Sequence, residues 1–203
     1  MRPDFKIIAD IISAKARVID IGCGNGDLLK YLAKKKQVEG RGIELDQRNA
    51  SRAVSRGISV IQGDADADLK YYPDKSFDYA ILSQTIQATK NPKEILLEML
   101  RIANHAIVSF PNFGHIRNRL YLCLKGRMPV TKNLSYEWYE TPNIHFCTIK
   151  DFVALAGELG LTIEKKYYVT RYGGESLFSG LIGGLSLANL FGDQGIFLLK
   201  KEG

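Results

Sequence analysis

The sequence has few cysteines, prolines and tryptophans: three, six and one among 203 residues. Cys23, Cys123 and Cys147 form an odd and widely spaced set, which builds no disulfide framework and fits no zinc-ligand spacing. We therefore expect no metal site, and a reducing cytoplasm is the simplest compartment for the chain.

Long apolar runs are also missing. The first six residues mix acidic and basic side chains with apolar ones, unlike a secretory signal peptide. The glycine-rich segment 177–192 is apolar but too short to span a bilayer, and its glycines weaken a helix. We interpret it as a packed or surface loop, with weak membrane contact as the alternative, and expect no stable membrane association.

Charge of one sign does not dominate the chain. Twenty-eight basic and 22 acidic residues give a net charge of +6, and 45% of the residues are hydrophobic, which is the balance of a folded protein. The only compact basic run, Lys34 to Lys36, falls where a helix should end, and cations there complement the helix dipole. A nucleic-acid partner is the alternative that the positive charge suggests, but the scattered basic residues favour none.

Short apolar runs alternate with helical patterns, which predicts a single α/β domain over residues 1–203. Strands are expected at 17–21, 41–45, 58–62, 77–83, 105–110, 161–170 and 195–200. Helices are expected at 27–36, 47–56, 92–102 and 150–159, with Asp46 as the cap of the second. The result is a Rossmann-like fold: a seven-stranded, mostly parallel sheet with helices on both faces and an antiparallel last strand.

A glycine-rich loop follows the first expected strand. Gly22, Gly24 and Gly26 let the backbone turn tightly and approach a ligand, because no Cβ intervenes. The loop leads into a helix at the carboxyl edge of the sheet, where ligands of such sheets bind. The dinucleotide fingerprint would need glycine where Asp27 stands, and a carboxylate there repels pyrophosphate. Asp20 instead suits an amino-acid-bearing nucleoside, since its carboxylate can face an ammonium.

Acidic residues follow the next two strands. Glu44, with Leu45 beside it, ends the second strand, and a carboxylate there can accept both ribose hydroxyls. Asp64 follows the third strand, where it can accept the exocyclic amine of adenine, and Ala65 leaves room for the ring. A lone acid at a strand end is usually a helix cap. The ordered set of loop and two acids, however, predicts a nucleoside site.

This ordered set resembles the class I S-adenosylmethionine-dependent methyltransferase superfamily across residues 7–110. The resemblance implies S-adenosylmethionine (or S-adenosylhomocysteine) as the cofactor. It places Asp20 and the glycine loop near the methionyl part, Glu44 at the ribose and Asp64 at the adenine. It also implies that Ser83, Gln84 and Thr85, which end and follow the fourth strand, line the methyl-donor side.

No methyl-acceptor motif is legible. The run Ser83-Gln84-Thr85-Ile86-Gln87 stands where an Asn-Pro-Pro-Tyr type motif would follow the fourth strand. His115 and His145 could serve as bases, but hydrogen bonding within a loop or interface is the simpler role. Cys23 is interpreted as a small filler inside the cofactor loop rather than a nucleophile. The catalytic residues therefore stay unassigned.

The alternation of strands and helices breaks over residues 111–149, a segment rich in aromatic, histidine and arginine side chains. It holds the single tryptophan, and rigid rings with arginine forks are typical of recognition surfaces. A folded lid is the alternative, and the two roles are compatible. The residues expected to contact a partner or substrate are His115, Arg117, Arg119, Arg127, Trp138, Tyr139, Asn143 and His145.

Three runs in this segment are long and unusual: Asn112-Phe113-Gly114-His115, then residues 126–131, then Tyr136-Glu137-Trp138-Tyr139 followed by residues 141–145. They are similar to the MetW family of methionine biosynthesis proteins, and the similarity covers nearly the whole chain. The resemblance implies association with a homoserine O-acyltransferase, MetX, that depends on MetW-like proteins for activity. It favours an activating or regulatory subunit. The alternatives are a catalytically active small-molecule methyltransferase and, from the basic charge, a nucleic-acid methyltransferase.

Overall fold

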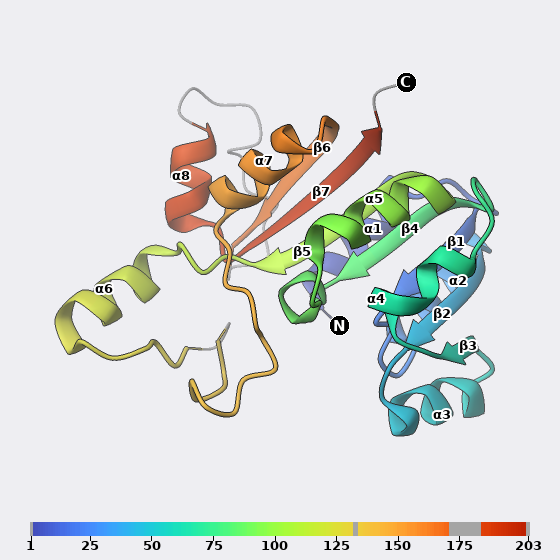
Figure 1. Cartoon of the computed structure of the whole chain (residues 1–203), viewed down its shortest axis with the longest axis horizontal. Coiled ribbons are helices and arrows are strands. Elements are labelled where there is room, and N and C mark those ends of the chain that lie inside the picture. Colours follow the sequence, from blue (N-terminus) through green and yellow to red (C-terminus); the bar gives the residue numbers. More distant parts are fainter. Residues whose placement is uncertain (1, 132–133, 171–183, 202–203) are drawn as a thin grey trace.

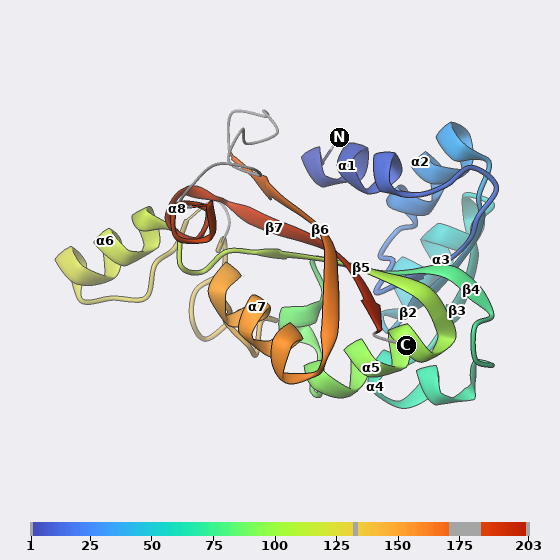
Figure 2. The ribbon, with the colours of Figure 1, turned by 90° about the horizontal axis from the view of Figure 1, so that it is seen from above.

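The computed structural model describes residues 2–131, 134–170 and 184–201. Seven strands form one sheet in the order β3-β2-β1-β4-β5-β7-β6, and helices cover both faces (Figures 1 and 2). Neighbouring strands are parallel except at β7, which pairs antiparallel with β5 and β6. The Rossmann-like arrangement predicted from the sequence is therefore confirmed.

The elements have the following bounds in chain order. The strands are β1 (Arg17–Ile21), β2 (Glu39–Glu44), β3 (Ser59–Gln62), β4 (Phe77–Ser83), β5 (Ala103–Pro111), β6 (Leu161–Val169) and β7 (Gln194–Lys201). The helices are α1 (Pro3–Ile11), α2 (Asp27–Lys36), α3 (Gln47–Ser55), α4 (Ala65–Asp68), α5 (Pro92–Ile102), α6 (Ile116–Lys125), α7 (Ile149–Glu158) and α8 (Gly184–Phe191). Two short 3₁₀ turns are η1 (Leu69–Tyr71) and η2 (Ile86–Ala88).

The central strands bury alternate side chains on opposite faces of the sheet. On β1, Val18 packs in the cluster with α1 and α2, whereas Ile19 and Ile21 pack in the cluster with α5 and α7. Because strand side chains alternate, Asp20 near the end of β1 points toward the layer of α1 and α2. Ser83, at the end of β4, points the same way and contacts α1. The fold thus brings these two polar groups beneath the first helix.

Several expected elements have the predicted bounds. β1, α2, β4 and α5 match at both ends, and β4 lies in the middle of the sheet. β2 begins two residues earlier than expected and ends at Glu44, so Leu45 lies outside the strand. Asp46 caps α3 as predicted, because its side chain accepts a hydrogen bond from the Asn49 amide at 2.9 Å.

The sequence pattern misses α1, α4 and α6. Helix α6 is capped by His115, whose ring accepts a hydrogen bond from the Arg117 amide, and by Gly126, which has a φ of +61°. Asn118 is the one buried residue among the ten of this helix. Because α6 buries no apolar stripe, its sequence lacks the periodicity that marks a helix packed on a core.

The interpretation of residues 177–192 as a loop is wrong for residues 184–191, which form α8. This helix packs against α7 and buries Ala188 and Asn189, so tertiary contacts outweigh its weak propensity. Gly184 is its first residue, where glycine costs least, and residues 177–183 lie outside the described ranges. Within those ranges, no helix combines the length and apolarity needed to cross a bilayer.

Candidate functional site

The loop between β1 and α2 forms the floor of the site. Its three glycines have φ values of +70°, +55° and +74°, in the left-handed region that favours glycine. The amides of Gly22 and Cys23 donate to the Ile43 carbonyl on β2, at 2.8 and 3.2 Å. A Cβ on Gly22 would lie 2.6 Å from Thr85 Cγ2. Glycine is therefore required where the loop passes between β2 and the turn after β4.

Glu44 connects the glycine loop to the end of β2. Its Oε2 accepts a hydrogen bond from the Gly24 amide at 2.7 Å, and its Oε1 accepts one from the Asp46 amide at 3.0 Å. Each carboxylate oxygen can accept a second hydrogen bond. Glu44 therefore shapes the loop and keeps acceptor capacity toward the adjoining cleft, which Leu45 also lines.

This adenosyl-sized cleft has a volume of about 440 Å³ and opens at the carboxyl edge of the sheet. Asp64 and Ala65 line it together with Gly22 of the glycine loop. Asp64 caps α4, because its Oδ1 accepts a hydrogen bond from the Asp66 amide at 3.0 Å, and its Oδ2 lies 3.3 Å from Lys90 Nζ. A helix cap is the usual role of an acid at the end of a strand, and Asp64 fills this role while it also lines the cleft.

A second, smaller compartment of about 180 Å³ adjoins the first, and Gly22 lines both. Asp20, Cys23, Gly24 and Ser83 line it together. The remaining lining residues are Asn25 from the loop, Asp27 and Leu28 from the start of α2, and Arg2 and Phe5 from the start of the chain. The site therefore has two connected parts, one flanked by Glu44 and Asp64 and the other by Asp20.

Asp20 is a buried acidic group of the smaller compartment with a strongly raised pKa. Its side chain is 2% exposed, and its Oδ1 has no hydrogen-bond partner among the described residues. Burial raises its pKa from 3.8 to about 7; the Arg2 guanidinium opposes this shift, and the Glu44 and Asp4 carboxylates add to it. A buried, unpartnered acceptor is costly, so the compartment is shaped to receive a hydrogen-bond donor or a cation.

Asn25 and Gln84 also have buried polar atoms without hydrogen-bond partners among the described residues. These atoms are Asn25 Oδ1 and Gln84 Nε2. Gln84 also has a φ of +59°, a strained value for a residue other than glycine, and its amide donates to the Ser109 carbonyl. Strain and unmet hydrogen-bonding capacity thus gather at the turn after β4 and at the glycine loop.

The Cys23 thiol fills space beside the loop. A Cβ on Gly42 would lie 2.5 Å from Cys23 Sγ, so the sulfur packs directly on the β2 backbone. Burial, with the neighbouring Asp20 and Glu44 carboxylates, raises the pKa of this thiol to about 12. A thiol that stays protonated is a poor nucleophile, as expected of a packing residue.

The predicted cofactor residues come together with one exception. Gly26 lines neither compartment; it caps α2, and a Cβ there would lie 3.1 Å from Ile58. Gln84, which the resemblance places beside Ser83, lines the larger cleft. Sequence reasoning missed Arg2 and Asn25 as individual lining residues. Asn25 had a signal, because it lies within the glycine loop, whereas Arg2 reaches the site only through the packing of α1.

The segment after β5, residues 111–149, is anchored at its start. Asn112 Nδ2 donates to the carbonyls of Asn189 and Gly192, and its Oδ1 accepts from the Gly114 amide at 3.0 Å. His115 is 8% exposed, caps α6 and lies 3.9 Å from Asp193 Oδ1. These buried polar contacts fix the point from which α6 extends away from the sheet (Figure 1).

Beyond the anchor, this segment exposes much of its apolar surface. Leu124 is 77% exposed on α6, and Trp138 and Tyr139 are 69% and 66% exposed. Arg117, Arg119 and Arg127 are exposed as well.

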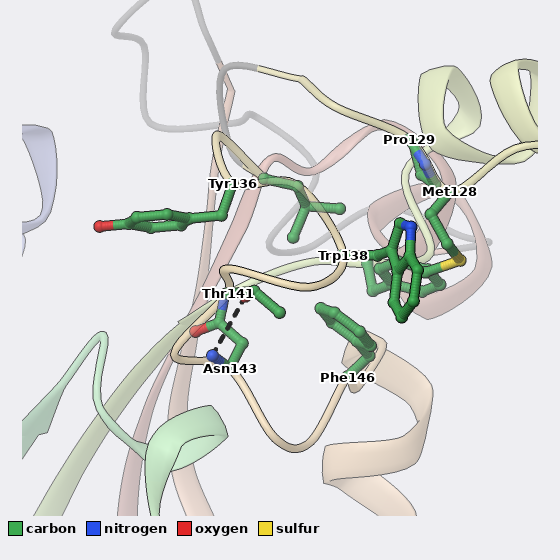
Figure 3. Close-up of a pocket in the computed structure, with 9 residues that line it drawn as sticks. Met128, Pro129, Tyr136, Trp138, Thr141, Asn143 and Phe146 are labelled. Carbon is green, nitrogen blue, oxygen red and sulfur yellow. Dashed lines mark hydrogen bonds between the residues drawn. The ribbon is translucent and has the colours of Figure 1, made fainter.

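Figure 3 shows Trp138 beside Met128 and Phe146, whereas Tyr136 points away from them. The cavity among these side chains is about 20 Å³, room for about one water molecule. The rings therefore form a surface rather than a small-molecule pocket.

The end of the segment returns to the sheet and covers η2. The amides of Ile144 and His145 both donate to the Gln87 carbonyl, at 2.9 and 3.0 Å. Pro142 lines the adenosyl-sized cleft, and the Asn143 amide donates to Thr141 Oγ1. The end of the segment therefore lies where a lid would lie, whereas its projecting part is exposed as a recognition surface would be.

An apolar cleft of about 330 Å³ lies between η2 and α7. Ile86, Phe152 and Leu155 supply apolar walls, and His145 lies at its edge. Gln87 Oε1 is buried there without a hydrogen-bond partner among the described residues.

Comparison with known proteins identifies the relatives of this chain. Residues 2–199 match the family model described as methionine biosynthesis protein MetW. The bifunctional methionine biosynthesis protein MetXA/MetW of Rhodopirellula baltica is 38% identical over 174 residues, which cover 81% of this chain. The match covers 28% of that relative, so the chain spans little more than a quarter of its length.

Solved structures share the fold at low sequence identity. An S-adenosylmethionine-dependent methyltransferase of Mesorhizobium loti has a TM-score of 0.69 and 14% identity, with 98% of each chain covered. Another such enzyme, of Archaeoglobus fulgidus, has a TM-score of 0.67 and 17% identity, over 98% of this chain and 91% of its own. At these identities the likeness establishes the fold alone.

Proposed function

The chain belongs to the MetW family of methionine biosynthesis proteins, and on this premise we propose that it is an S-adenosyl-nucleotide-binding partner of a homoserine O-acyltransferase. The observation that carries the partner is the relative from Rhodopirellula baltica, whose single polypeptide bears both the MetXA and the MetW names. A partner joined covalently in one organism is a natural candidate for a separate partner in another.

The residues around the glycine loop fit S-adenosylmethionine or S-adenosylhomocysteine. The larger cleft suits the adenosyl part, with Glu44 accepting from the ribose hydroxyls and Asp64 from the adenine amine. In the smaller compartment, the unpartnered oxygens of Asp20 and Asn25 suit the ammonium of the amino-acid part. When bound, the sulfonium of S-adenosylmethionine supplies an electrophilic methyl group.

The exposed apolar surface of the segment 111–149 supports a protein partner. Apolar and aromatic side chains that stand 66–77% exposed, as Leu124, Trp138 and Tyr139 do, are typical of interfaces waiting for a second protein. The regulatory idea follows from linkage: a nucleotide that binds the free and the partner-bound forms unequally shifts their association.

The direct test is to copurify the chain with the homoserine O-acyltransferase and to measure that enzyme's activity with and without it. We expect a stable complex and a higher acyltransferase activity in its presence. Calorimetry of the association, with and without S-adenosylhomocysteine, then tests the regulation. Equal affinities in the two titrations would remove the regulatory part, and an enzyme that neither binds nor responds would remove the partner.

Replacing both Trp138 and Tyr139 by alanine is expected to weaken the complex with the acyltransferase about tenfold. Exposed aromatic residues are frequent hot spots, and a loss of about 1.4 kcal/mol is tenfold in affinity. The matched control is Tyr71→Ala, which removes a 75% exposed tyrosine on η1. Calorimetry should find the control within twofold of the wild type. An unchanged affinity in the double variant would place the interface elsewhere, and an equal loss in the control would show that the effect is not specific to Trp138 and Tyr139.

Methyl transfer to a small molecule is a second candidate, favoured by the apolar cleft beside η2. Gln87 Oε1 could accept a hydrogen bond from an acceptor molecule there, and His145 at the edge could take a proton. We expect labelled methyl groups from S-adenosylmethionine to appear in a small-molecule fraction of cell extract. Gln87→Leu should reduce this transfer several-fold. If no label is transferred, or if Gln87→Leu leaves transfer unchanged, this candidate fails.

A further inference from the structure

Arg2 lines the smaller compartment and forms the N-terminal boundary of α1. Its Nε donates to Asp4 Oδ1 at 3.2 Å, and its Nη2 donates to Asp4 Oδ2 and to Ser83 Oγ. The guanidinium carbon lies 4.9 Å from the centroid of the Phe5 ring. Three different contacts therefore hold one cation in a fixed orientation.

The Asp4 carboxylate is the buried group that holds the Arg2 guanidinium in place. Its side chain is fully buried, and Ser83 Oγ donates to its Oδ2 at 3.1 Å. Ser83 Oγ in turn lies 3.2 Å from Ser109 Oγ on β5. This buried carboxylate is bound by both Arg2 and Ser83. It positions the guanidinium accurately, because the planar guanidinium can donate to a carboxylate in only a few orientations.

The guanidinium keeps hydrogen-bonding capacity toward the compartment. Arg2 has five N–H donors, and the contacts above involve Nε and Nη2. No contact of Nη1 is found among the described residues, and the Arg2 side chain is 46% exposed. Asp20 lines the same compartment, and Arg2 favours its ionised form. Asp27 also lines it, but its carboxylate is paired with Arg56 Nη2 at 2.6 Å. The compartment thus presents a fixed cation and a buried carboxyl group to one ligand.

A cation and a carboxyl group in one small space match an α-amino acid zwitterion, which carries the opposite charges. We propose that Arg2 binds the carboxylate of the ligand's amino-acid part, while Asp4 and Ser83 position the guanidinium. This inference rests on the proposed nucleotide site and assigns a specificity residue within it. The compartment then selects ligands that carry an intact amino acid from nucleosides that lack one.

Three ligands separate this role from a general effect on the fold. S-adenosylhomocysteine has both the ammonium and the carboxylate, decarboxylated S-adenosylmethionine keeps only the ammonium, and 5′-methylthioadenosine has neither. Calorimetry of Arg2→Gln should find a loss of about 10- to 30-fold for S-adenosylhomocysteine, the usual effect of one charge-assisted pair. The affinities for the other two ligands should stay within about twofold, and Arg2→Lys should recover part of the loss.

The controls address folding and the nearby charge. Arg2→Gln leaves Asp4 buried without its cation, so the double variant Arg2→Gln/Asp4→Asn, which removes both charges, is measured beside it. Lys6→Gln removes an exposed cation from the same helix and should bind all three ligands like the wild type. Parallel losses for all three ligands, or none in either Arg2 variant, would overturn the inference. If the wild-type chain binds 5′-methylthioadenosine, the proposed nucleotide site stands whatever the result for Arg2. If it binds none of the three ligands, the nucleotide site and the role of Arg2 both fail.

Discussion

Gly24→Asp should lower the affinity for S-adenosylhomocysteine by at least about 100-fold and leave the chain folded. A Cβ on Gly24 would meet no atom within 4 Å, so it projects into open space within the smaller compartment. The φ of +55° is one that aspartate tolerates better than most residues. The new carboxylate would occupy the space of the ligand's amino-acid part. A 100-fold loss corresponds to about 2.7 kcal/mol.

Gly57→Asp is the matched control for this variant. Gly57 follows α3 with a φ of +81°, and a Cβ there also meets nothing within 4 Å. The two variants therefore carry the same added charge and similar backbone strain, but only one alters the compartment. Calorimetry should find Gly57→Asp within twofold of the wild type, and circular dichroism should find both folded. Equal affinities for the two variants would show that the ligand does not use the glycine loop.

The parts of the fold that the sequence predicts correctly are those with local signals. β4 is mostly apolar and lies between β1 and β5, where most of its residues are buried. α5 begins with a proline and buries residues at helical spacing, so its pattern and its packing agree. α6 buries none of its apolar residues, and no periodicity could reveal a helix whose apolar side chains face outward.

The candidate site divides in the same way. The glycine loop, Glu44 and Asp64 each lie at or just after the end of a strand. A parallel sheet therefore places them at one edge as soon as the strands are recognised. Arg2 and Ser83 are 81 positions apart and meet only because the first turn of α1 packs against the end of β4. Contacts of that range depend on the packed structure and leave no trace in local spacing.

Asp20 is expected to make the affinity for S-adenosylhomocysteine pH-dependent. Burial raises its pKa to about 7, so below that pH the ligand-free chain holds a neutral carboxyl group that does not attract an ammonium. Binding of the ammonium favours the ionised form and therefore releases a proton. Affinity should rise about tenfold for each pH unit between pH 5.5 and 7 and level off above 7, measured by calorimetry in buffers of different ionisation enthalpy.

The raised pKa of Asp20 also makes the stability of the fold depend on pH. A pKa raised above its unfolded value of 3.8 means that the folded chain holds this proton more tightly, so the contribution favours folding at low pH. It is lost as the pH rises from about 4 to 7. Asp20→Asn cannot ionise, so the ligand-free variant should unfold at a higher temperature than the wild type at pH 8, by a stabilisation on the order of a few kcal/mol.

Asp20→Asn should also lose about 100-fold in affinity for S-adenosylhomocysteine at pH 8, with no remaining pH dependence. 5′-Methylthioadenosine lacks the ammonium, so its affinity should be independent of pH and unchanged in the variant. If the variant is more stable yet binds more weakly, the Asp20 carboxylate lowers the stability of the fold and serves ligand recognition. If the variant were less stable and its affinity kept the wild-type pH profile, Asp20 would serve the packing of β1 and another group would meet the ammonium.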